Sequence, residues 1–320
     1  MPNFEKLLCP TDFSEGAHQA LAQAVLIAER FGSEIHLLHA IEIHKANPYN
    51  PAYHFPETDE IWQRLGQVTA TEMTKLVKPY AESLKVHQVQ ERGIAAGPVI
   101  LNYAEKHAVD LIVMGTQGLR GPRRFFLGSV TEEVMRSSHC PVLIIPKPAQ
   151  PSSVEAIRTI LAPVDFSDNS KAALNLAKEV AHTLGAHLHL IHVLEARHYT
   201  GYFPSTGDSS IPNAEKVKEI AQERLQTFAG EATGVTQKYH VAIGYAASEI
   251  LALASRIEAD LIVIGSQGFS PLEDFIFGST AEGVARRAEC SVLTVKRAKV
   301  KERAKAKERA KDKERAKDAS

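Results

Sequence analysis

Two glycine-containing segments with one shared spacing are the residues of this sequence best suited to binding a ligand. In each, a Gly-x2-Gly turn is followed after nine residues by Gly-Ser; the first segment covers Gly115–Ser129 and the second Gly265–Ser279. Glycine lets a backbone adopt positive φ and approach a ligand closely, and free N–H groups at a helix start attract anions. The spacing therefore predicts two phosphate sites, in which Ser129 and Ser279 donate a hydroxyl and cap the following helix.

A purely structural role is the alternative for these glycines. They would then only make tight turns between a strand and a helix. For one segment alone both interpretations are open, but retention of the whole spacing in both segments favours the phosphate sites.

The two segments belong to a sequence that repeats itself with a period of about 150 residues. So long a period indicates two domains rather than solenoid units. We predict domains over residues 1–147 and 154–297, a linker rich in Pro, Ser and Gln over 148–153, and a charged tail over 298–320. The matching segments are Leu7–Ser14 with Ile160–Ser167, Ile35–Glu42 with Leu188–Glu195, and Asp110–Gly115 with Asp260–Gly265.

Strand and helix patterns alternate within each copy. The strand Lys6–Cys9 precedes Ser14, the expected N-cap of a helix that ends at Gly32, and Ser167 and Gly185 bracket the equivalent helix. Short apolar runs are typical of parallel strands buried on both faces. These runs are Leu111–Met114, Val142–Ile145, Leu261–Ile264 and Val292–Val295.

This alternation predicts an α/β fold with two tandem doubly wound parallel sheets. In such sheets ligands bind outside the carboxyl ends of the strands, where the strand order reverses. The loops after Cys9 and Met114 should therefore form one site, and those after Ala162 and Ile264 another.

The glycine spacing, placed after a strand ending Asp-Leu-Ile-Val-(Met/Ile)-Gly, is similar to the ATP-binding signature of the universal stress protein family. The opening Pro-(Thr/Val)-Asp-Phe-Ser and the closing Cys-Pro-Val-Leu-Ile-Ile-Pro also resemble that family, over nearly all of residues 1–297. The resemblance implies two five-stranded parallel sheets flanked by helices, of the adenine nucleotide α-hydrolase-like, Rossmann-like kind. It also implies binding of ATP or AMP, with a divalent cation held by the phosphates, and dimerisation through the last strand.

The resemblance also assigns roles to individual residues. Asp12 and the backbone near Ala40 would hold the adenine end, and the glycine segment would hold the ribose and phosphates. The nucleotide-binding residues of the first copy would be Pro10, Thr11, Asp12, Ala40, Met114, Gly115, Gln117, Gly118, Gly128, Ser129, Val130 and Thr131. Those of the second copy would be Pro163, Val164, Asp165, Val193, Ile264, Gly265, Gln267, Gly268, Gly278, Ser279 and Thr280.

The nine-residue spacers differ in charge. The first contains Arg120, Arg123 and Arg124, whose guanidinium groups could neutralise phosphates. The second contains Glu273 and Asp274 and no basic residue. The arginines could equally belong to a solvated loop, but if one domain alone binds ATP, we expect it to be the first.

The composition argues against several other classes of protein. The hydrophobic and charged fractions, 44% and 23%, are those of a soluble globular protein, and no apolar run approaches the roughly 20 residues of a membrane span. Three scattered cysteines and an N-terminus unlike a signal peptide favour a cytoplasmic protein. P-loop, dinucleotide-binding and nucleophile-elbow motifs are missing.

Fourteen histidines raise the question of a metal site. They are densest at His36 and His39, and at His187, His189 and His192. Because no cysteine or carboxylate cluster completes a site, we expect structural or surface histidines and no bound metal.

The C-terminal segment has its own charge balance. From residue 296 to 320 there are twelve Lys or Arg against five Asp or Glu, about +7, which leaves about −8 for the rest of the chain. Alanines six residues apart spread over all faces of a helix, so a coiled coil is excluded. A solvated helix or disordered segment is expected. The alternative is an electrostatic arm for nucleic acid, an anionic membrane or the acidic body, and no other nucleic-acid contact is expected.

These patterns favour a nucleotide-dependent regulator of the stress response rather than an enzyme. ATP would stabilise one arrangement of loops and interfaces that an unidentified protein partner recognises. The domains would pair as an intramolecular pseudo-dimer through Pro141–Pro146 and Ser291–Val295, and a homodimer is a further option. Two alternatives stay open: a slow ATPase or nucleotide hydrolase, with lone Asp12 or Asp165 as its base, and an interaction module that binds no nucleotide.

Overall fold

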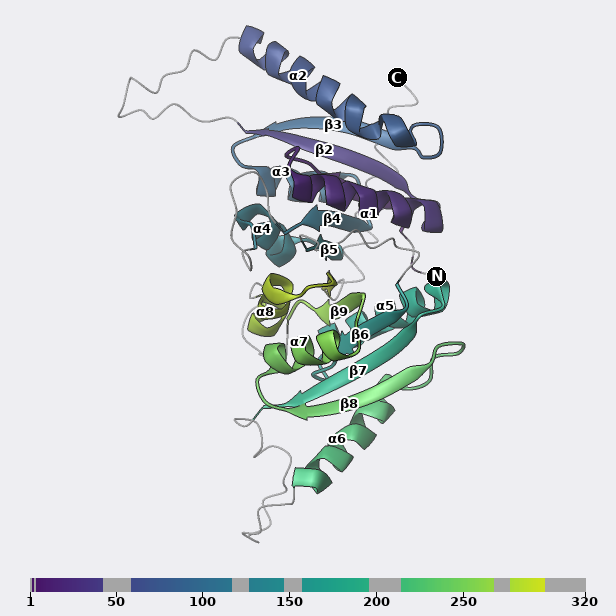
Figure 1. Cartoon of the computed structure of the whole chain (residues 1–320). Helices are drawn as coiled ribbons and strands as arrows, with labels where there is room; N and C mark the ends of the chain where they lie inside the picture. Colours follow the sequence, from purple (N-terminus) through teal and green to yellow (C-terminus); the bar gives the residue numbers. More distant parts are fainter. Residues whose placement is uncertain are drawn as a thin grey trace, which may run out of the picture. The chain divides into compact units, whose positions relative to one another are not determined.

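The chain folds into two compact units, one before and one after the segment that joins the copies. The computed structural model describes Pro2 and residues 4–42, 59–116, 127–146, 157–195, 214–267 and 277–296 (Figure 1). The predicted linker 148–153 and tail 298–320 lie outside the described residues, so the domain boundaries stay predictions.

The first unit is a five-stranded parallel sheet in the order β3-β2-β1-β4-β5. The order reverses between β1 and β4, as a doubly wound fold requires. In chain order the elements are β1 (Lys6–Pro10), α1 (Glu15–Phe31), β2 (Glu34–Glu42), α2 (Asp59–Val77), the 3-10 helix η2 (Lys78–Tyr80), β3 (Val86–Gly93), α3 (Ala96–Lys106), β4 (Leu111–Gly115), α4 (Ser129–Ser137) and β5 (Val142–Ile145).

The second unit repeats this plan, with the strand order β10-β9-β6-β7-β8 and every described pairing parallel. The predicted fold class is therefore confirmed in both copies. The elements are β6 (Thr159–Pro163), α5 (Asp168–Leu184), β7 (His187–Leu194), α6 (Ala214–Ala229), β8 (Gln237–Ile243), α7 (Ala246–Arg256), β9 (Leu261–Gly265), α8 (Ser279–Arg287) and β10 (Ser291–Val295).

The first helix of each unit begins and ends where the sequence predicts. The Ser14 hydroxyl accepts a hydrogen bond from the Ala17 N–H, and the Ser167 hydroxyl accepts one from the Ser170 N–H. Gly32, at φ +69°, ends α1, and Gly185, at φ +67°, ends α5, since left-handed backbone favours glycine.

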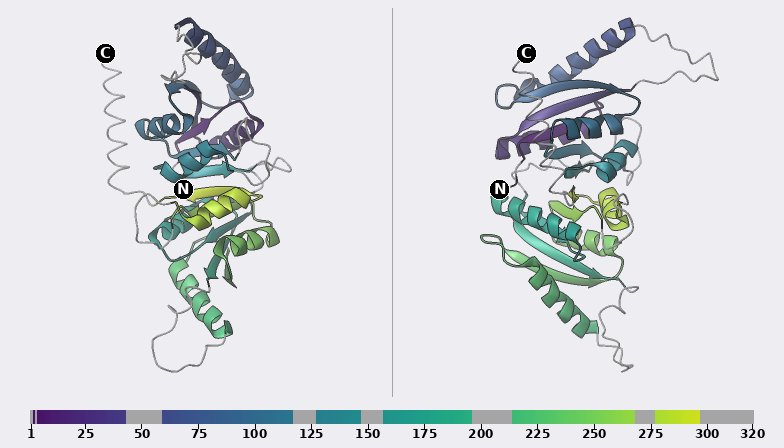
Figure 2. Two further views of the ribbon diagram at one scale, coloured as in Figure 1. Left: turned by 90° about the vertical axis from the view of Figure 1, so that its left-hand side faces the viewer. Right: turned by 180° about the vertical axis from the view of Figure 1, so that it is seen from behind.

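Helices cover both faces of each sheet (Figures 1 and 2). In the first unit α1 packs on β1, β2, β4 and β5, whereas α3 packs on β2, β3 and α4. The central strands are consequently buried on both sides, which explains the continuous apolar runs Leu111–Met114 and Leu261–Ile264.

Candidate functional site

The loop between β1 and α1 is held in one conformation by hydrogen bonds from its backbone N–H groups. Thr11 N–H donates to the Leu38 carbonyl at 2.8 Å, and Ser14 N–H donates to Asp12 Oδ1 at 3.0 Å. Phe13 between them has φ +63°, a left-handed conformation that is costly for a bulky residue. The carboxylate of Asp12 is therefore oriented by the backbone at the carboxyl edge of the sheet.

The second unit builds the same loop. Val164 N–H donates to the Ile191 carbonyl at 2.8 Å, Ser167 N–H donates to Asp165 Oδ1 at 2.9 Å, and Phe166 has φ +66°. Asp165 is exposed, whereas Asp12 is half-buried. The two loops share a backbone but present their carboxylates to solvent to different degrees.

A histidine from the neighbouring strand braces each loop. His39 Nδ1 donates to the Thr11 carbonyl and His192 Nδ1 to the Val164 carbonyl, both at 2.8 Å. The His39 ring lies 4.7 Å from that of Phe13, centroid to centroid. A structural role was expected for these histidines, and the contacts place them behind the predicted adenine end.

The first glycine of each segment is required by helix packing. A Cβ on Gly115 would lie 2.6 Å from the Gly16 carbonyl oxygen of α1, and one on Gly265 would lie 2.9 Å from the Asn169 carbonyl carbon of α5. Neither glycine has positive φ, and neither do Gly128 and Gly278. Positive φ, one of the two reasons expected for these glycines, was therefore wrong for all four, whereas close approach to a ligand stays a prediction. Close approach of the first helix explains the first glycine of each segment.

The helix after the glycine segment starts one residue earlier than predicted. Gly128 is the N-cap of α4 and Gly278 that of α8, and neither end has a side-chain cap hydrogen bond. Ser129 and Ser279 are the exposed first helical residues, so their predicted capping role was wrong. Glycine caps leave the first-turn N–H groups of these helices without a capping side chain, an arrangement suited to an anion.

Hydrogen bonds join the two ends of the first glycine segment. Gly128 N–H donates to the Thr116 carbonyl at 2.8 Å, and the Thr131 hydroxyl donates to the Gly115 carbonyl at 2.9 Å. In the second unit Gly278 N–H donates to the Ser266 carbonyl at 2.8 Å. Ala281 stands where Thr131 stands in the first unit, so the hydroxyl contact is lost.

Most of the predicted nucleotide-binding residues therefore meet at the carboxyl edge of each sheet. The glycine segments approach the first helices through Gly115 and Gly265, directly after the loops of Asp12 and Asp165. Gln117, Gly118 and Gly268, together with Arg120, Arg123, Arg124, Glu273 and Asp274 of the spacers, lie outside the described residues.

In the second unit α6 contacts this loop. The Arg224 guanidinium lies 4.3 Å from the centroid of the Phe166 ring, and the Phe228 ring meets Phe166 edge-on at 5.3 Å. Burial lowers the pKa of His192 behind Phe166, and Arg224 adds to the effect. Sequence analysis missed Arg224, because nothing in its local pattern distinguishes it from a solvated helix residue.

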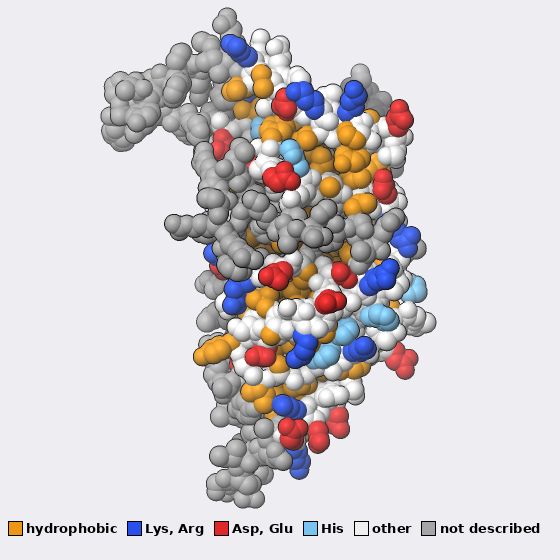
Figure 3. All heavy atoms as spheres, viewed as in Figure 1, with side chains coloured by type: hydrophobic (Ala, Val, Ile, Leu, Met, Phe, Trp, Pro, Cys, Tyr) orange, Lys and Arg blue, Asp and Glu red, His pale blue; other side chains and the backbone are white. Residues whose placement is uncertain are grey.

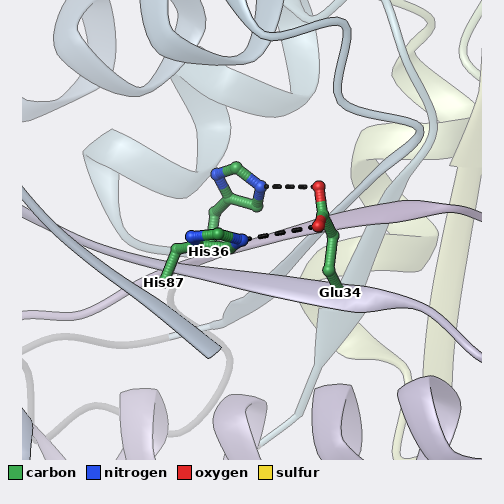
Figure 4. Close-up of side chains that lie close together, drawn as sticks. All are labelled: Glu34, His36 and His87. Carbon is green, nitrogen blue, oxygen red and sulfur yellow. Dashed lines mark hydrogen bonds and ion pairs between the residues drawn. The ribbon is translucent and has the colours of Figure 1, made fainter. Parts of the chain in front are cut away.

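A cluster that sequence analysis also missed lies at the other end of β2. Glu34, His36 and His87 converge there, although no carboxylate partner was expected for the histidines (Figure 4). The alternation of Glu34 and His36 on one strand was the available signal, since residues two apart share a face.

The universal stress protein family model matches residues 3–146 and, a second time, residues 156–296. The chain belongs to the universal stress protein family. A universal stress protein of Methanocaldococcus jannaschii is 33% identical over 150 residues, which cover 45% of this chain and 84% of that protein. One relative of this length thus corresponds to one half of the chain.

Solved structures extend the likeness to both halves. A universal stress protein from Archaeoglobus fulgidus matches with a TM-score of 0.62 at 26% identity, covering 92% of this chain and 98% of that one. A Pseudomonas aeruginosa protein described as functionally unknown matches with a TM-score of 0.63 at 19% identity, covering 97% and 98%, which supports the fold alone. The tandem arrangement is therefore shared with other members of the universal stress protein fold.

One face of this universal stress protein carries mixed charge. On the face shown in Figure 3, acidic and basic side chains are interspersed over both units. Such a face does not present the single-sign field that attracts a polyanion. None of the described helices combines the length and the apolar character that a membrane crossing needs.

Proposed function

We propose that this universal stress protein binds ATP, or AMP, in the first unit and acts as a nucleotide-dependent regulator of the stress response. The observation that carries the proposal is the convergence, at the strand switch point between β1 and β4, of the Asp12 loop with a glycine-capped helix. Parallel sheets bind their ligands at such switch points, and uncapped helix N-termini favour phosphate.

The proposed orientation of the nucleotide follows from the order of the binding groups along the carboxyl edge of the first sheet. Asp12 and the backbone at Ala40 hold the adenine end, and Gly115 with Gly128–Thr131 holds ribose and phosphates. A divalent cation would then be held by the phosphates themselves. The hydrogen bond from Thr131 to the Gly115 carbonyl supports this pose, because it fixes the glycine loop against α4 before a ligand arrives.

The second unit is proposed as a weaker nucleotide site. Its loop keeps the backbone of the first, but Ala281 replaces the hydroxyl of Thr131 and the spacer holds Glu273 and Asp274. Acidic side chains beside a phosphate oppose binding.

Binding without turnover is part of the proposal. The carboxylates of Asp12 and Asp165 each accept a backbone N–H from the serine two residues later, at 3.0 and 2.9 Å. A carboxylate engaged in this way is better suited to orienting a ligand than to accepting a proton from water. At most weak hydrolysis is expected.

Titration calorimetry with ATP and with AMP on the full chain tests the proposal. We expect Gly118→Val to abolish the stronger binding and the matched Gly268→Val to affect the weaker binding alone. Lack of binding by the unmodified chain would overturn the proposal in favour of an interaction module. Phosphate release that Asp12→Ala removes while binding survives would favour a hydrolase instead.

The proposed function also includes a cellular location and a state of assembly. A cytosolic location is supported by three free cysteines, of which Cys9 and Cys140 are buried. Three further predictions concern assembly: pairing of the two halves through their last strands, formation of a homodimer, and a protein partner that recognises the nucleotide-bound state. Cross-linking and analytical ultracentrifugation with and without ATP would test them.

A further inference from the structure

Three ligand-type side chains meet at the start of β2, at the strand end opposite the proposed nucleotide site. Glu34 and His36 lie two residues apart on β2 and so share one face. His87 on β3 is the register partner of His36, which places the two imidazoles side by side. Figure 4 shows both rings turned toward the carboxylate of Glu34.

The distances within this cluster suit a small cation. His36 Nε2 lies 3.3 Å from Glu34 Oε1, and His87 Nε2 lies 3.4 Å from Glu34 Oε2. One ligand atom from each residue lies within 4.8 Å of the other two. Bonds of about 2.0–2.1 Å in a tetrahedral zinc site put neighbouring ligand atoms about 3.3 Å apart, close to the spacing between the carboxylate and each ring.

A tyrosine holds one of the two imidazoles in place. His36 Nδ1 lies 2.6 Å from the Tyr103 hydroxyl on α3, and Tyr103 stacks on His107 at 4.1 Å between centroids. Metal-binding histidines typically use their second nitrogen for such a contact, which fixes the ring orientation. The contact leaves Nε2 of His36 directed at Glu34.

The cluster is closed on one side and open on the other. The side chain of His36 is 8% exposed and that of Glu34 18%, whereas that of His87 is 42% exposed. An ion can therefore enter past His87, and water can complete its coordination. Two imidazoles, one carboxylate and an open position are a donor set that Zn²⁺ accepts.

We propose that Glu34, His36 and His87 bind a divalent transition-metal ion of the Zn²⁺ type, with water as the fourth ligand. The ion would tie β2 to β3 at the amino ends of the strands. This inference is independent of the proposed nucleotide binding, because the strand ends and the residues involved are different.

An ion-pair network is the competing explanation for the cluster. Lys85 Nζ donates to Glu34 Oε2 at 2.7 Å, and Lys6 Nζ lies 3.9 Å from Glu34 Oε1. The side chain of Lys85 is 69% exposed, and so open an ion pair stabilises by about 1 kcal/mol or less. Metal ligation can displace that contact, because the lysine loses little by turning to solvent.

The second unit supplies a natural comparison. His189 of β7 corresponds to His36, but its register partner is Lys238 rather than a histidine, and His187 stands in place of Glu34. The ammonium group of Lys238 cannot replace the imidazole of His87 as a ligand, and among the described residues of the second unit no three ligand side chains converge as these do. The metal site is therefore proposed for the first unit alone.

Titration of the untagged, metal-free full chain with Zn²⁺ against a chromophoric chelator, and with Co²⁺ followed by its visible absorption, tests the proposal. We expect one equivalent of tight binding and the strong visible bands of four-coordinate Co²⁺. His87→Asn, at a half-exposed position, should weaken binding by more than about 100-fold, and Tyr103→Phe by about 10-fold, as changes outside the ligand set do.

Two further variants separate metal binding from an ion-pair network. Lys85→Met should tighten Zn²⁺ binding by about two- to fivefold, because a competing ammonium group is removed. His240→Asn in the second unit is the matched control and should leave binding unchanged. Absence of the Co²⁺ bands, or equal Zn²⁺ affinity in the parent chain and His87→Asn, would overturn the proposal.

Discussion

The two units keep the same backbone devices and differ in the side chains around them. Phe13 and Phe166 share left-handed backbone with φ of +63° and +66°, and Gly115 and Gly265 share the close approach of the first helix. These positions are set by sterics, which tolerate few residue types. Side chains that do not determine the backbone conformation differ between the two units.

The two units also differ in how the first helix contacts the helix that follows the second strand. Lys171 Nζ donates to the Phe228 carbonyl, and Lys178 Nζ donates to the Ala229 carbonyl at 2.5 Å, so two cations of α5 hold the C-terminal end of α6. In α1 the corresponding residues are His18 and Val25. Cations near a helix C-terminus stabilise its exposed carbonyls, a device used in the second unit and not at these positions of the first.

The shared glycines should produce the largest effect and should do so in both units. Gly115→Ala and Gly265→Ala are each expected to destabilise the protein by about 3 kcal/mol in guanidinium unfolding, because the new Cβ meets helix backbone. Gly66→Ala, inside α2 with 3.4 Å to Gln90 Oε1, is the control and should be neutral or stabilising. Equal stability of Gly115→Ala and the control would show that the first helix does not need this glycine.

Acid should destabilise the second unit through the stacked pair His189 and His240. Burial, with help from His240, lowers the pKa of His189 to about 4. The unfolded chain takes up this proton near pH 6.5, so it binds more protons than the folded protein between about pH 6.5 and 4. The free energy of unfolding should therefore fall as the pH drops through that window, by about 3 kcal/mol at full linkage and by about 2 kcal/mol once solvent screening is allowed for, and this contribution stays constant above the window.

A histidine substitution identifies the source of that acid sensitivity. His189→Gln removes this titrating group and should make the dependence of stability on pH less steep between pH 6.5 and 4, measured by urea unfolding at several pH values. A profile as steep as that of the parent chain would assign the effect to other groups.

The lysines of α5 should matter less than the glycines and in the second unit alone. Lys178→Met is expected to destabilise by about 1 kcal/mol, since the carbonyls at the end of α6 lose their cation. Lys218→Met, which removes a 3.7 Å pair with Glu215 on the surface of α6, should cost about 0.5 kcal/mol or less. Thermal unfolding of both variants measures the difference, and equal shifts in melting temperature would argue against a stabilising role of Lys178 at the end of α6.

An effect no larger than that of Lys178→Met is expected from the hydroxyls of the glycine segments. Thr131→Ala should destabilise the protein by about 1 kcal/mol through loss of its hydrogen bond to Gly115. Ser266→Ala should be neutral or stabilising, because the Ser266 hydroxyl is buried without a hydrogen-bond partner among the described residues. Chemical denaturation measures the free energy of unfolding of both variants. A larger loss of stability in Ser266→Ala than in Thr131→Ala would mean that the Ser266 hydroxyl has a partner beyond the described residues.

The location of the candidate nucleotide site was largely predictable, because its residues directly follow strands that can each be recognised from the local sequence. The carboxyl ends of parallel strands meet at one edge, so Asp12 and Gly115 come together in any doubly wound arrangement of these segments. The cap at Gly128 was mispredicted by one residue, since a helix start depends on the local backbone path as well as on residue type.

By itself the sequence determined the repeat and the fold class, and it predicted the edge of the sheet where the candidate site residues lie, since all three depend on local periodicity and on motifs. Only the tertiary structure decided why Gly115 must be glycine, which side chains of α5 and α6 meet, and that His87 faces His36. Each of these depends on packing or register between segments far apart in the chain, and local patterns do not encode such a register.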